Sequence, residues 1–404
     1  NLIYRGAKHT ERNVLGTLET INGFKREEIL DFYEKWYRPD LQAVIIVGDF
    51  EMDDMEARVK RIFSTVPVGE NLVPKEEYPI PAITDPVFEN IIDPDIKFQA
   101  FKVLHRLPYP DRNERQYDDF WKQFYIKNVI TSMVATRLKK VSQKPDSPAN
   151  SAVVVTNSVS DDFYTTLFTI TPKKEDQLEE ALRLYEREIR RMLEFGFSED
   201  EFEVAKTNIW KRYRLDNEIS RESIENETIV NICLEHFLRD VPMVLPDKLL
   251  EIQKNVLGNL EFKEVMAYVP AMLKDCEKFY TYNVGNDKVH LLPSTERMKE
   301  IIAEVQTEKL TPEFVEFKKV DLVKDVAAGK IEKIKKVKGM DAELWTLSNG
   351  AKVYWMPVPE IKSGTHLIME AIYDNGYNAW DQTQIAKTKA ATSYISREIG
   401  FGKS

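Results

Sequence analysis

The chain has 404 residues, a net charge of −10 at pH 7 and a hydrophobic fraction of 43%. This length exceeds the ~100–200 residues of one ordinary domain, and the hydrophobic fraction is enough to build cores. The acidic balance argues against a nucleic acid or another polyanion as partner, and the sequence has no run of about 18 apolar residues that could span a membrane.

Residues 1–66 are predicted to be the C-terminal part of a first α/β domain, whose first strands are absent from the sequence. Apolar periodicity predicts a helix at about 26–37, which Pro39 stops because proline lacks an amide donor. The apolar run Leu41–Val47 predicts a strand buried on both faces, and a second helix is expected at about 52–64. Three aromatic side chains at the end of the first helix are expected to pack in a core: Phe32, Trp36 and Tyr37.

Residues 67–85 are rich in proline, which predicts an extended connector. Residues 86–290 are then predicted to form a complete second domain. It is expected to begin with one or two strands within 88–104, followed by a helix over 115–141 with Phe120 and Phe124 facing inward. A hairpin of strands 151–157 and 163–171 and a helix from 178 to 195 come next. Further helices are expected to begin at 199, 221, 247 and 261, and a strand over 278–284 ends the domain. With the later helices set aside, the order is β-α-β-β-α-β. The predicted fold class is therefore α+β, a ferredoxin-like split arrangement with a helical insertion beside the sheet.

Residues 291–340 are predicted to be a second connector, and its lysine-rich part 330–338 is expected to be a solvated charged segment. Residues 341–404 are predicted to begin a further domain. Its expected elements are strands 344–347 and 352–356 joined by a turn at Asn349-Gly350, a strand over 367–373 and a helix over 385–399.

No combination of residues marks an active site. Neither Cys233 nor Cys276 has the CxxC neighbour or nearby histidine of a zinc site. Glu235 and His236 lie on a predicted helix, but an inverted zinc motif H-x-x-E-H would need a histidine at position 232, which is Ile232. The glycine-rich and serine-centred motifs of nucleotide binding and nucleophilic catalysis are also absent from the sequence. We therefore predict no catalytic and no metal-binding residue in this chain, and we assign no substrate-binding residue.

Three stretches together resemble the pitrilysin/insulinase-type zinc peptidases, the family that includes mitochondrial processing peptidase. The first joins residues 12–17, RNVLGT, to residues 32–50, FYEKWYRPDLQAVIIVGDF. The second is residues 197–206, FSEDEFEVAK, and the third is residues 345–354, WTLSNGAKVY. The resemblance covers nearly the whole chain in order and spacing, and the long single-chain bacterial members fit best.

The resemblance implies a duplicated clamshell, in which four related domains form two halves that close around a peptide. Residues 86–290 would be the second, non-catalytic domain, residues 291–340 the linker between the halves, and residues 341–404 the start of a third, degenerate repeat. The family's zinc ligands and catalytic glutamate would lie before Asn1, and the Arg and Tyr of its last domain would lie beyond Ser404. The corresponding helix of the third domain, IAKTKAA at 385–391, carries no zinc ligand. No catalytic residue therefore carries over onto this chain.

The function implied by the resemblance is that of a fragment of a zinc-dependent metalloendopeptidase. Zinc and a peptide substrate belong to the parent protein, while this portion has a structural and substrate-positioning role and is inactive alone. The bacterial members favour a periplasmic or cell-envelope location, and self-association of half-molecules stays open. One alternative is an inactive family member that serves as a binding or structural subunit, and another is an unrelated α+β binding module.

Overall fold

The computed structural model describes the chain except residues 1, 13–14, 69–71, 76–77, 111–114, 116, 159–161, 223–224, 318–328 and 358–404. The chain divides into two compact units, Asn1–Ala328 and Gly329–Ser404. The predicted strand 367–373 and helix 385–399 lie outside the described residues. Within the described part, no helix combines the length and the hydrophobicity needed to cross a membrane.

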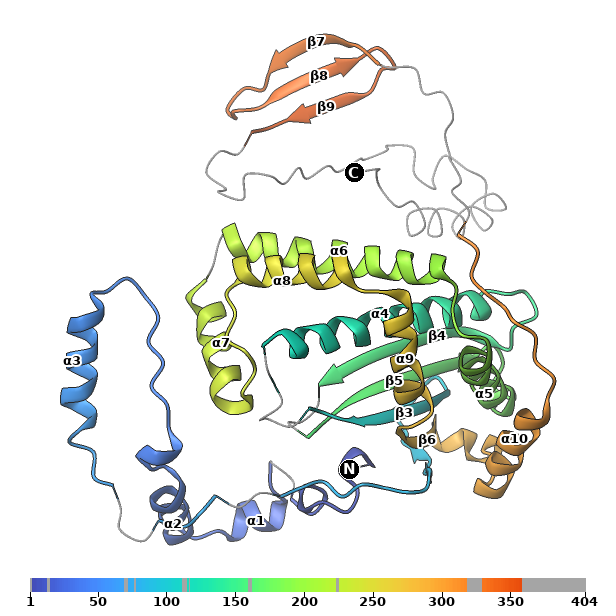
Figure 1. Cartoon of the computed structure of the whole chain (residues 1–404), viewed down its shortest axis with the longest axis horizontal. Coiled ribbons are helices and arrows are strands. Elements are labelled where there is room, and N and C mark those ends of the chain that lie inside the picture. Colours follow the sequence, from blue (N-terminus) through green and yellow to red (C-terminus); the bar gives the residue numbers. More distant parts are fainter. Residues whose placement is uncertain are drawn as a thin grey trace. The chain divides into compact units, whose positions relative to one another are not determined.

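A sheet of six described strands forms the centre of the first unit (Figure 1). Its four long strands are β3 (Ala100–Pro108), β4 (Ala149–Ser158), β5 (Phe163–Pro172) and β6 (Glu277–Val284). Two short strands, β1 (Val87–Phe88) and β2 (Ile91–Ile92), pair with β6 in parallel. The long strands lie in the order β6-β3-β5-β4 with antiparallel neighbours, which is the order 4-1-3-2 along the chain. This order confirms the predicted split β-α-β-β-α-β arrangement.

Two helices build the core with this sheet. α4 (Tyr117–Ser142) packs mainly on β4, and α5 (Leu178–Phe195) packs on β5 and β3. Apolar residues at helical spacing on α5 are buried: Leu178, Ala181, Leu182, Tyr185, Ile189 and Met192. Alternate residues of the strands face the same core, among them Phe101, Val103, Phe168 and Ile170. Apolar side chains that recur every 3.6 residues in the helix thus pack against side chains that recur every two residues in the strands, and together they form one apolar layer.

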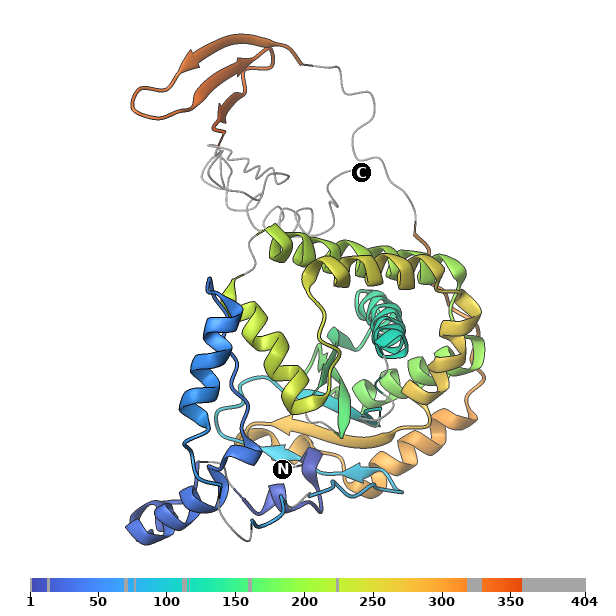
Figure 2. The ribbon, with the colours of Figure 1, turned by 60° about the vertical axis from the view of Figure 1, so that its left-hand side comes forward.

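The helical insertion between α5 and β6 consists of α6 (Glu199–Glu222), α7 (Asn226–Arg239), α8 (Pro246–Asn259) and α9 (Phe262–Leu273). α6 begins with a capping box: the Glu201 amide donates to Ser198 Oγ at 3.2 Å, and the Ser198 amide donates to the Glu201 carboxylate at 2.8 Å. α6 and α8 run side by side in both views (Figures 1 and 2), and both contact α4. α4 therefore lies between the sheet and the pair α6 and α8, whereas α9 contacts β3 directly.

α10 (Thr295–Thr307) continues the first unit into the stretch expected to be a connector. Its residues Met298, Ile301 and Val305 are buried, and the first two belong to the main core cluster. Arginines of α5 hold the chain beyond this helix, since Arg187 donates to the Glu308 carboxylate at 2.5 and 2.7 Å. The first part of the expected connector thus contains a helix of the core, because its apolar residues at positions i, i+3 and i+7 pack against α5.

Three helices lie between residues 15 and 66: α1 (Leu18–Gly23), α2 (Arg26–Trp36) and α3 (Met52–Phe63). The sequence predicts α2 and α3. α1 falls in a stretch without apolar periodicity and begins at Thr17, whose Oγ1 accepts a hydrogen bond from the Thr20 amide at 3.1 Å. The aromatic residues at the end of α2 do not pack in a core, since Phe32 is 57% and Tyr37 60% exposed.

The strand predicted over Leu41–Val47 is wrong. Pro39–Leu41 forms a 3-10 turn, η3, and residues 42–47 belong to no regular element. Val44 and Ile46 are 47% and 43% exposed. A buried strand needs neighbouring strands to satisfy its amides and carbonyls, and none of the described strands pairs with this segment. With no described strand beside it, the end of α2 also keeps its aromatic side chains Phe32 and Tyr37 exposed.

The second unit contains an antiparallel sheet of three described strands, β7 (Ile331–Lys336), β8 (Glu343–Leu347) and β9 (Lys352–Trp355). β8 and β9 form the predicted hairpin, and Gly350 in the turn has a φ of +84°, which favours glycine. β7 occupies the lysine-rich segment expected to be a solvated linker. Its side chains are exposed as expected, but its backbone pairs with β8.

Candidate functional site

The described part of the chain contains no group of three or more His, Cys, Asp and Glu side chains that could hold a metal ion. Its histidines lie on separate elements. The ring of His9 stacks on Tyr4 with 5.1 Å between ring centroids, and His236 Nδ1 lies 3.0 Å from the Val241 carbonyl at the end of α7. The two free cysteines are half-buried: Cys233 and Cys276. The described residues therefore offer no donor set for the zinc ion that the family resemblance implies. His366 lies outside them.

His105, on β3, is fully buried and is hydrogen-bonded at both ring nitrogens. Nδ1–H donates to the Met272 carbonyl at 2.9 Å, and Nε2 accepts from the Tyr185 hydroxyl at 2.5 Å. Because a carbonyl can only accept, this network assigns the neutral tautomer with its proton on Nδ1. Burial, reinforced by the charge of Lys278, lowers the pKa of His105 to about 3. The local sequence indicates no partner for this histidine, because Tyr185 and Met272 are 80 and 167 residues away along the chain.

Replacing His105 with Gln is expected to make the free energy of unfolding depend less on pH below pH 6.5. The folded-state pKa of about 3 lies below the ordinary 6.5, so below pH 6.5 the unfolded chain binds a proton that the folded chain does not. The stability contributed by this group is therefore complete above pH 6.5 and falls by about 1.4 kcal/mol per pH unit below it. Glu186 and Glu188 act in the opposite sense, because burial raises the pKa of both carboxyls and the folded chain takes up their protons first.

Urea unfolding at pH 7.5 and pH 5.0 measures the effect of His105. Between these pH values the native chain should lose about 2 kcal/mol more unfolding free energy than the His105→Gln variant, since the variant keeps both glutamates but has no imidazole. Parallel profiles for the two proteins would mean that His105 accepts its proton in the folded state.

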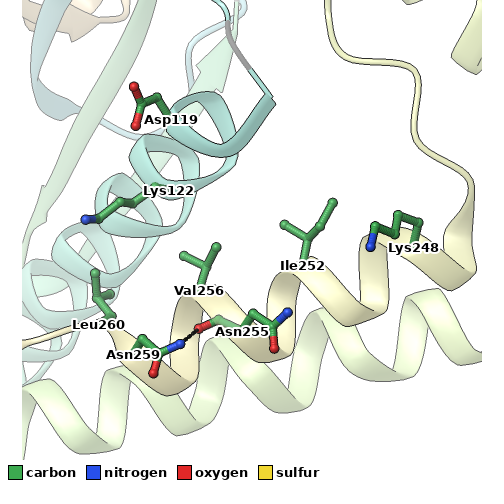
Figure 3. A pocket seen from close by; sticks show the side chains of 8 residues that line it. All are labelled: Asp119, Lys122, Lys248, Ile252, Asn255, Val256, Asn259 and Leu260. Carbon is green, nitrogen blue, oxygen red and sulfur yellow. Dashed lines mark hydrogen bonds between the residues drawn. The ribbon is translucent and has the colours of Figure 1, made fainter.

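A groove of about 480 Å³ lies between α4 and α8 (Figure 3). Its lining comes from the two helices and the residue after α8: Asp119, Lys122, Lys248, Ile252, Asn255, Val256, Asn259 and Leu260. Ile252 and Val256 project from α8 toward α4 and form an apolar strip. Asn259 Nδ2 donates to the Asn255 carbonyl at 2.8 Å, which holds one amide against the helix. The groove joins parts of the chain that are distant in sequence, so no local motif could have indicated it.

The positive charges at this groove already have carboxylate partners. Lys122 forms an ion pair with Glu264, and the hydrogen bond to that carboxylate raises the pKa of the lysine. Lys248 Nζ donates to the Glu251 carboxylate at 2.8 Å. The lining contains no histidine, serine, threonine or cysteine that could act as a general base or nucleophile beside them. This groove can therefore contact a ligand with mixed polar and apolar groups, but it lacks a nucleophile–base pair.

Comparison with known proteins finds a matching family and several relatives. Residues 23–209 match the family described as "Peptidase M16 inactive domain". The "Probable zinc protease PqqL" of Escherichia coli strain K12 is 20% identical over 285 residues, which cover 69% of this chain and 30% of that protein. The "Zinc protease PQQL-like" of Arabidopsis thaliana is also 20% identical, over 68% of this chain and 25% of that protein.

Solved structures share the fold. The crystal structure of the periplasmic protease PqqL from Escherichia coli aligns with a TM-score of 0.67 and 17% identity, over 88% of this chain and 39% of that one. The ferredoxin protease FusC, solved as a point mutant in complex with Arabidopsis ferredoxin, aligns with a TM-score of 0.66 and 21% identity, over 89% of this chain and 40% of that one.

The chain thus spans less than a third of the length of the two curated relatives. The matched region includes β3, β4, β5, α4 and α5, the elements that form most of the split sheet and its covering helices. The sequence motifs, the sheet order and the matched domain agree: residues 23–209 are similar to the inactive domain of the M16 peptidases, and the chain shares its fold with proteins described as zinc proteases.

Proposed function

We propose that this chain is the non-catalytic portion of a zinc-dependent metalloendopeptidase, which helps to position a peptide and does not cleave it alone. The match of residues 23–209 to the inactive M16 domain carries the proposal. The relatives described as zinc proteases are much longer than this chain, which leaves room for a zinc-binding segment of the H-x-x-E-H type elsewhere in the parent protein. The zinc-bound water would be activated there, and no residue of this chain takes part in that step.

Residues 1–66 belong, in this proposal, to the catalytic-type first domain, and residues 86–290 form the second domain. The exposed apolar side chains of residues 15–66 support the first assignment, because further strands could cover them; they include Leu18, Phe32, Tyr37, Ile46 and Ile62. Covering of the same side chains by a second half-molecule would give the self-association left open by the sequence. The third domain would begin near residue 341, within the second unit.

The substrate class and the location also belong to the proposal. One structural relative was solved with a ferredoxin bound, which supports a peptide or protein as the substrate of the parent protein. The groove between α4 and α8 suits such a ligand, since an apolar strip lies beside amide and charged groups. Another structural relative is a periplasmic protease, which supports a periplasmic location.

Zinc content and hydrolysis test the proposal. The 404-residue chain is expected to purify without stoichiometric zinc and without chelator-sensitive hydrolysis of a quenched fluorescent peptide, because its described residues offer no donor set. The intact gene product is expected to contain one zinc ion and to lose hydrolysis when the metal is removed. Zinc-dependent hydrolysis by the 404-residue chain would overturn the assignment to a non-catalytic portion. An intact product without zinc would overturn the enzyme proposal and leave the binding or structural subunit.

A further inference from the structure

A second cavity, of about 170 Å³, lies where α4 passes the ends of β3, β4 and β5. Tyr109 directly follows β3, Tyr164 lies near the start of β5, and Tyr213 reaches the cavity from α6. Phe120 and Phe124 line it from α4. Aromatic residues from four parts of the chain therefore make up half of its lining residues.

Lys127, on α4, brings a positive charge to this wall. Its Nζ lies 4.0 Å from the centroid of the Tyr164 ring and 5.8 Å from that of Tyr109. No carboxylate of the described residues forms an ion pair with it. Burial lowers the pKa of Lys127 to about 8, and no anion among the described residues opposes that shift. The Arg115 guanidinium lies 4.6 Å from the Tyr109 centroid, which adds a second cation at the same ring.

Charge, size and shape restrict what this cavity can take. The Lys127 ammonium at its wall repels a cationic ligand, although aromatic walls alone would attract one. A volume of about 170 Å³ is below the ~300–1,000 Å³ of pockets that enclose whole ligands, so it fits a single flat group. A phosphate dianion would need several charge-assisted donors, whereas the lining offers one ammonium and neutral groups such as Asn128 and Thr156. A monocarboxylate on an apolar ring matches all of these properties.

We propose that this cavity binds a carboxylate joined to an aromatic group, with the carboxylate paired to the Lys127 ammonium and the ring among the aromatic side chains. A free aryl carboxylate and the C-terminal phenylalanine of a peptide share this chemistry. The site is separate from the groove between α4 and α8, and it does not depend on the peptidase function.

Isothermal titration calorimetry of the 404-residue chain tests the site with two pairs of probes. Phenylacetate and the peptide Ala-Ala-Phe with a free C-terminus carry the carboxylate, while phenylacetamide and the amidated peptide are their neutral counterparts. At least one acid should bind at least tenfold more tightly than its amide, because only the acid can pair with the ammonium. Binding of phenylacetate alone identifies a small-molecule ligand, and binding of the peptide acid alone identifies a chain terminus. Equal affinity of acid and amide in both pairs, or no saturable binding of either acid, would overturn the proposal.

Lys127→Met should weaken binding of the acid at least tenfold. Lys140→Met is the matched control, since Lys140 lies on the same helix but is exposed, and this variant should bind as the native chain does. The native chain gives an independent readout, because a Lys127 pKa of about 8 predicts that the dissociation constant rises about tenfold between pH 7 and pH 9. If Lys127→Met does not fold, the pH dependence of the dissociation constant for the native chain tests the role of Lys127 instead. A dissociation constant that does not change with pH, or an unchanged affinity of Lys127→Met, would contradict the assignment.

Discussion

Replacing Glu201 with Ala is expected to lower the free energy of unfolding by about 4 kcal/mol, because the Arg137 guanidinium stays buried without its counter-ion. Both side chains are almost completely buried, at 2% and 1% exposure. Arg137 Nε donates to Glu201 Oε1 at 3.0 Å, and Nη2 donates to Oε2 at 2.6 Å, which is the bidentate geometry of a strong charge-assisted pair. Removing one member of such a pair costs more than the pair itself contributes.

The Arg137–Glu201 pair also contacts two other parts of the first unit. The Glu201 carboxylate accepts from the Ser198 amide at 2.8 Å and from the Val315 amide at 3.2 Å. Arg137 in turn donates to the Gly196 carbonyl at 3.0 Å. The pair therefore fixes α4 to the turn between α5 and α6 and to the chain that follows α10. Loss of Glu201 leaves several buried polar groups without partners, which adds to the cost.

Glu203→Ala is the matched control, because Glu203 lies on the same helix but is exposed and pairs with the nearby Lys206. Urea unfolding should show a loss of no more than about 1 kcal/mol for this variant. Combining Glu201→Ala with Arg137→Met removes the uncompensated charge, so the double variant should be more stable than Glu201→Ala alone. Equal losses for Glu201→Ala and Glu203→Ala would show that the buried pair does not hold these elements together.

Replacing Arg106 with Ala is expected to cost about 3 kcal/mol, near the lower end for a broken buried pair, because its partner Glu277 keeps some solvent exposure. The two residues face each other across β3 and β6 and form an ion pair. Arg106 Nη1 donates to the Ile3 carbonyl at 2.7 Å, and Nη2 donates to the Pro81 carbonyl at 2.8 Å. One guanidinium thus ties two distant parts of the chain to the sheet.

The surroundings of Arg106 make this contact difficult to replace. Its guanidinium carbon lies 5.3 Å from the ring centroids of both Phe163 and Phe279. Lysine could keep the charge but cannot supply the planar set of donors, so Arg106→Lys should lose part of the stability as well. Lys102→Ala, on the same strand, is the control and should change stability by less than about 0.5 kcal/mol.

Limited proteolysis with trypsin separates this local anchor from general destabilisation. Arg106→Ala should accelerate cleavage after Arg5 and Lys8, because residues 2–10 lose the hydrogen bond from Arg106 to the Ile3 carbonyl, one of their attachments to the sheet. The expected signature is a shortened N-terminus while the rest of the first unit stays intact. Unchanged cleavage at these two sites would contradict the anchoring role.

Many elements of both units were predictable because their signals are local. Helix α5 shows its apolar stripe within 18 residues, and Gly196 ends it with a φ of +68°. The capping box at Ser198 and the turn at Gly350 depend on side chains within a few residues of one another. Such patterns predict the elements and their order, and the order β-α-β-β-α-β restricts the sheet to few topologies.

Three features were hidden because they depend on partners. The apolar run 41–47 has strand composition, yet without a neighbouring strand among the described residues it stays irregular and exposed. β7 was not predicted from the sequence. Its pairing with β8 shifts in register between Ile331 and Lys333, so that Ile331 and Ile334 lie opposite residues of β8 that are two positions apart. Because of this shift, the sequence of β7 lacks the strict alternation of apolar and polar residues that predicts a strand. α10 became part of the core because α5 supplies a surface for its apolar residues.

Short motifs and periodicity in the sequence were enough to establish the family resemblance, the fold class and the absence of a recognisable catalytic motif. The three-dimensional packing was needed to show where charges lie in apolar surroundings. Arg106, Arg137 and His105 become buried by contacts with residues far away along the chain. The same holds for Lys127, whose aromatic surroundings come from several elements. Free energies of burial and ion pairing depend on which groups meet in space, and that cannot be computed from local spacing.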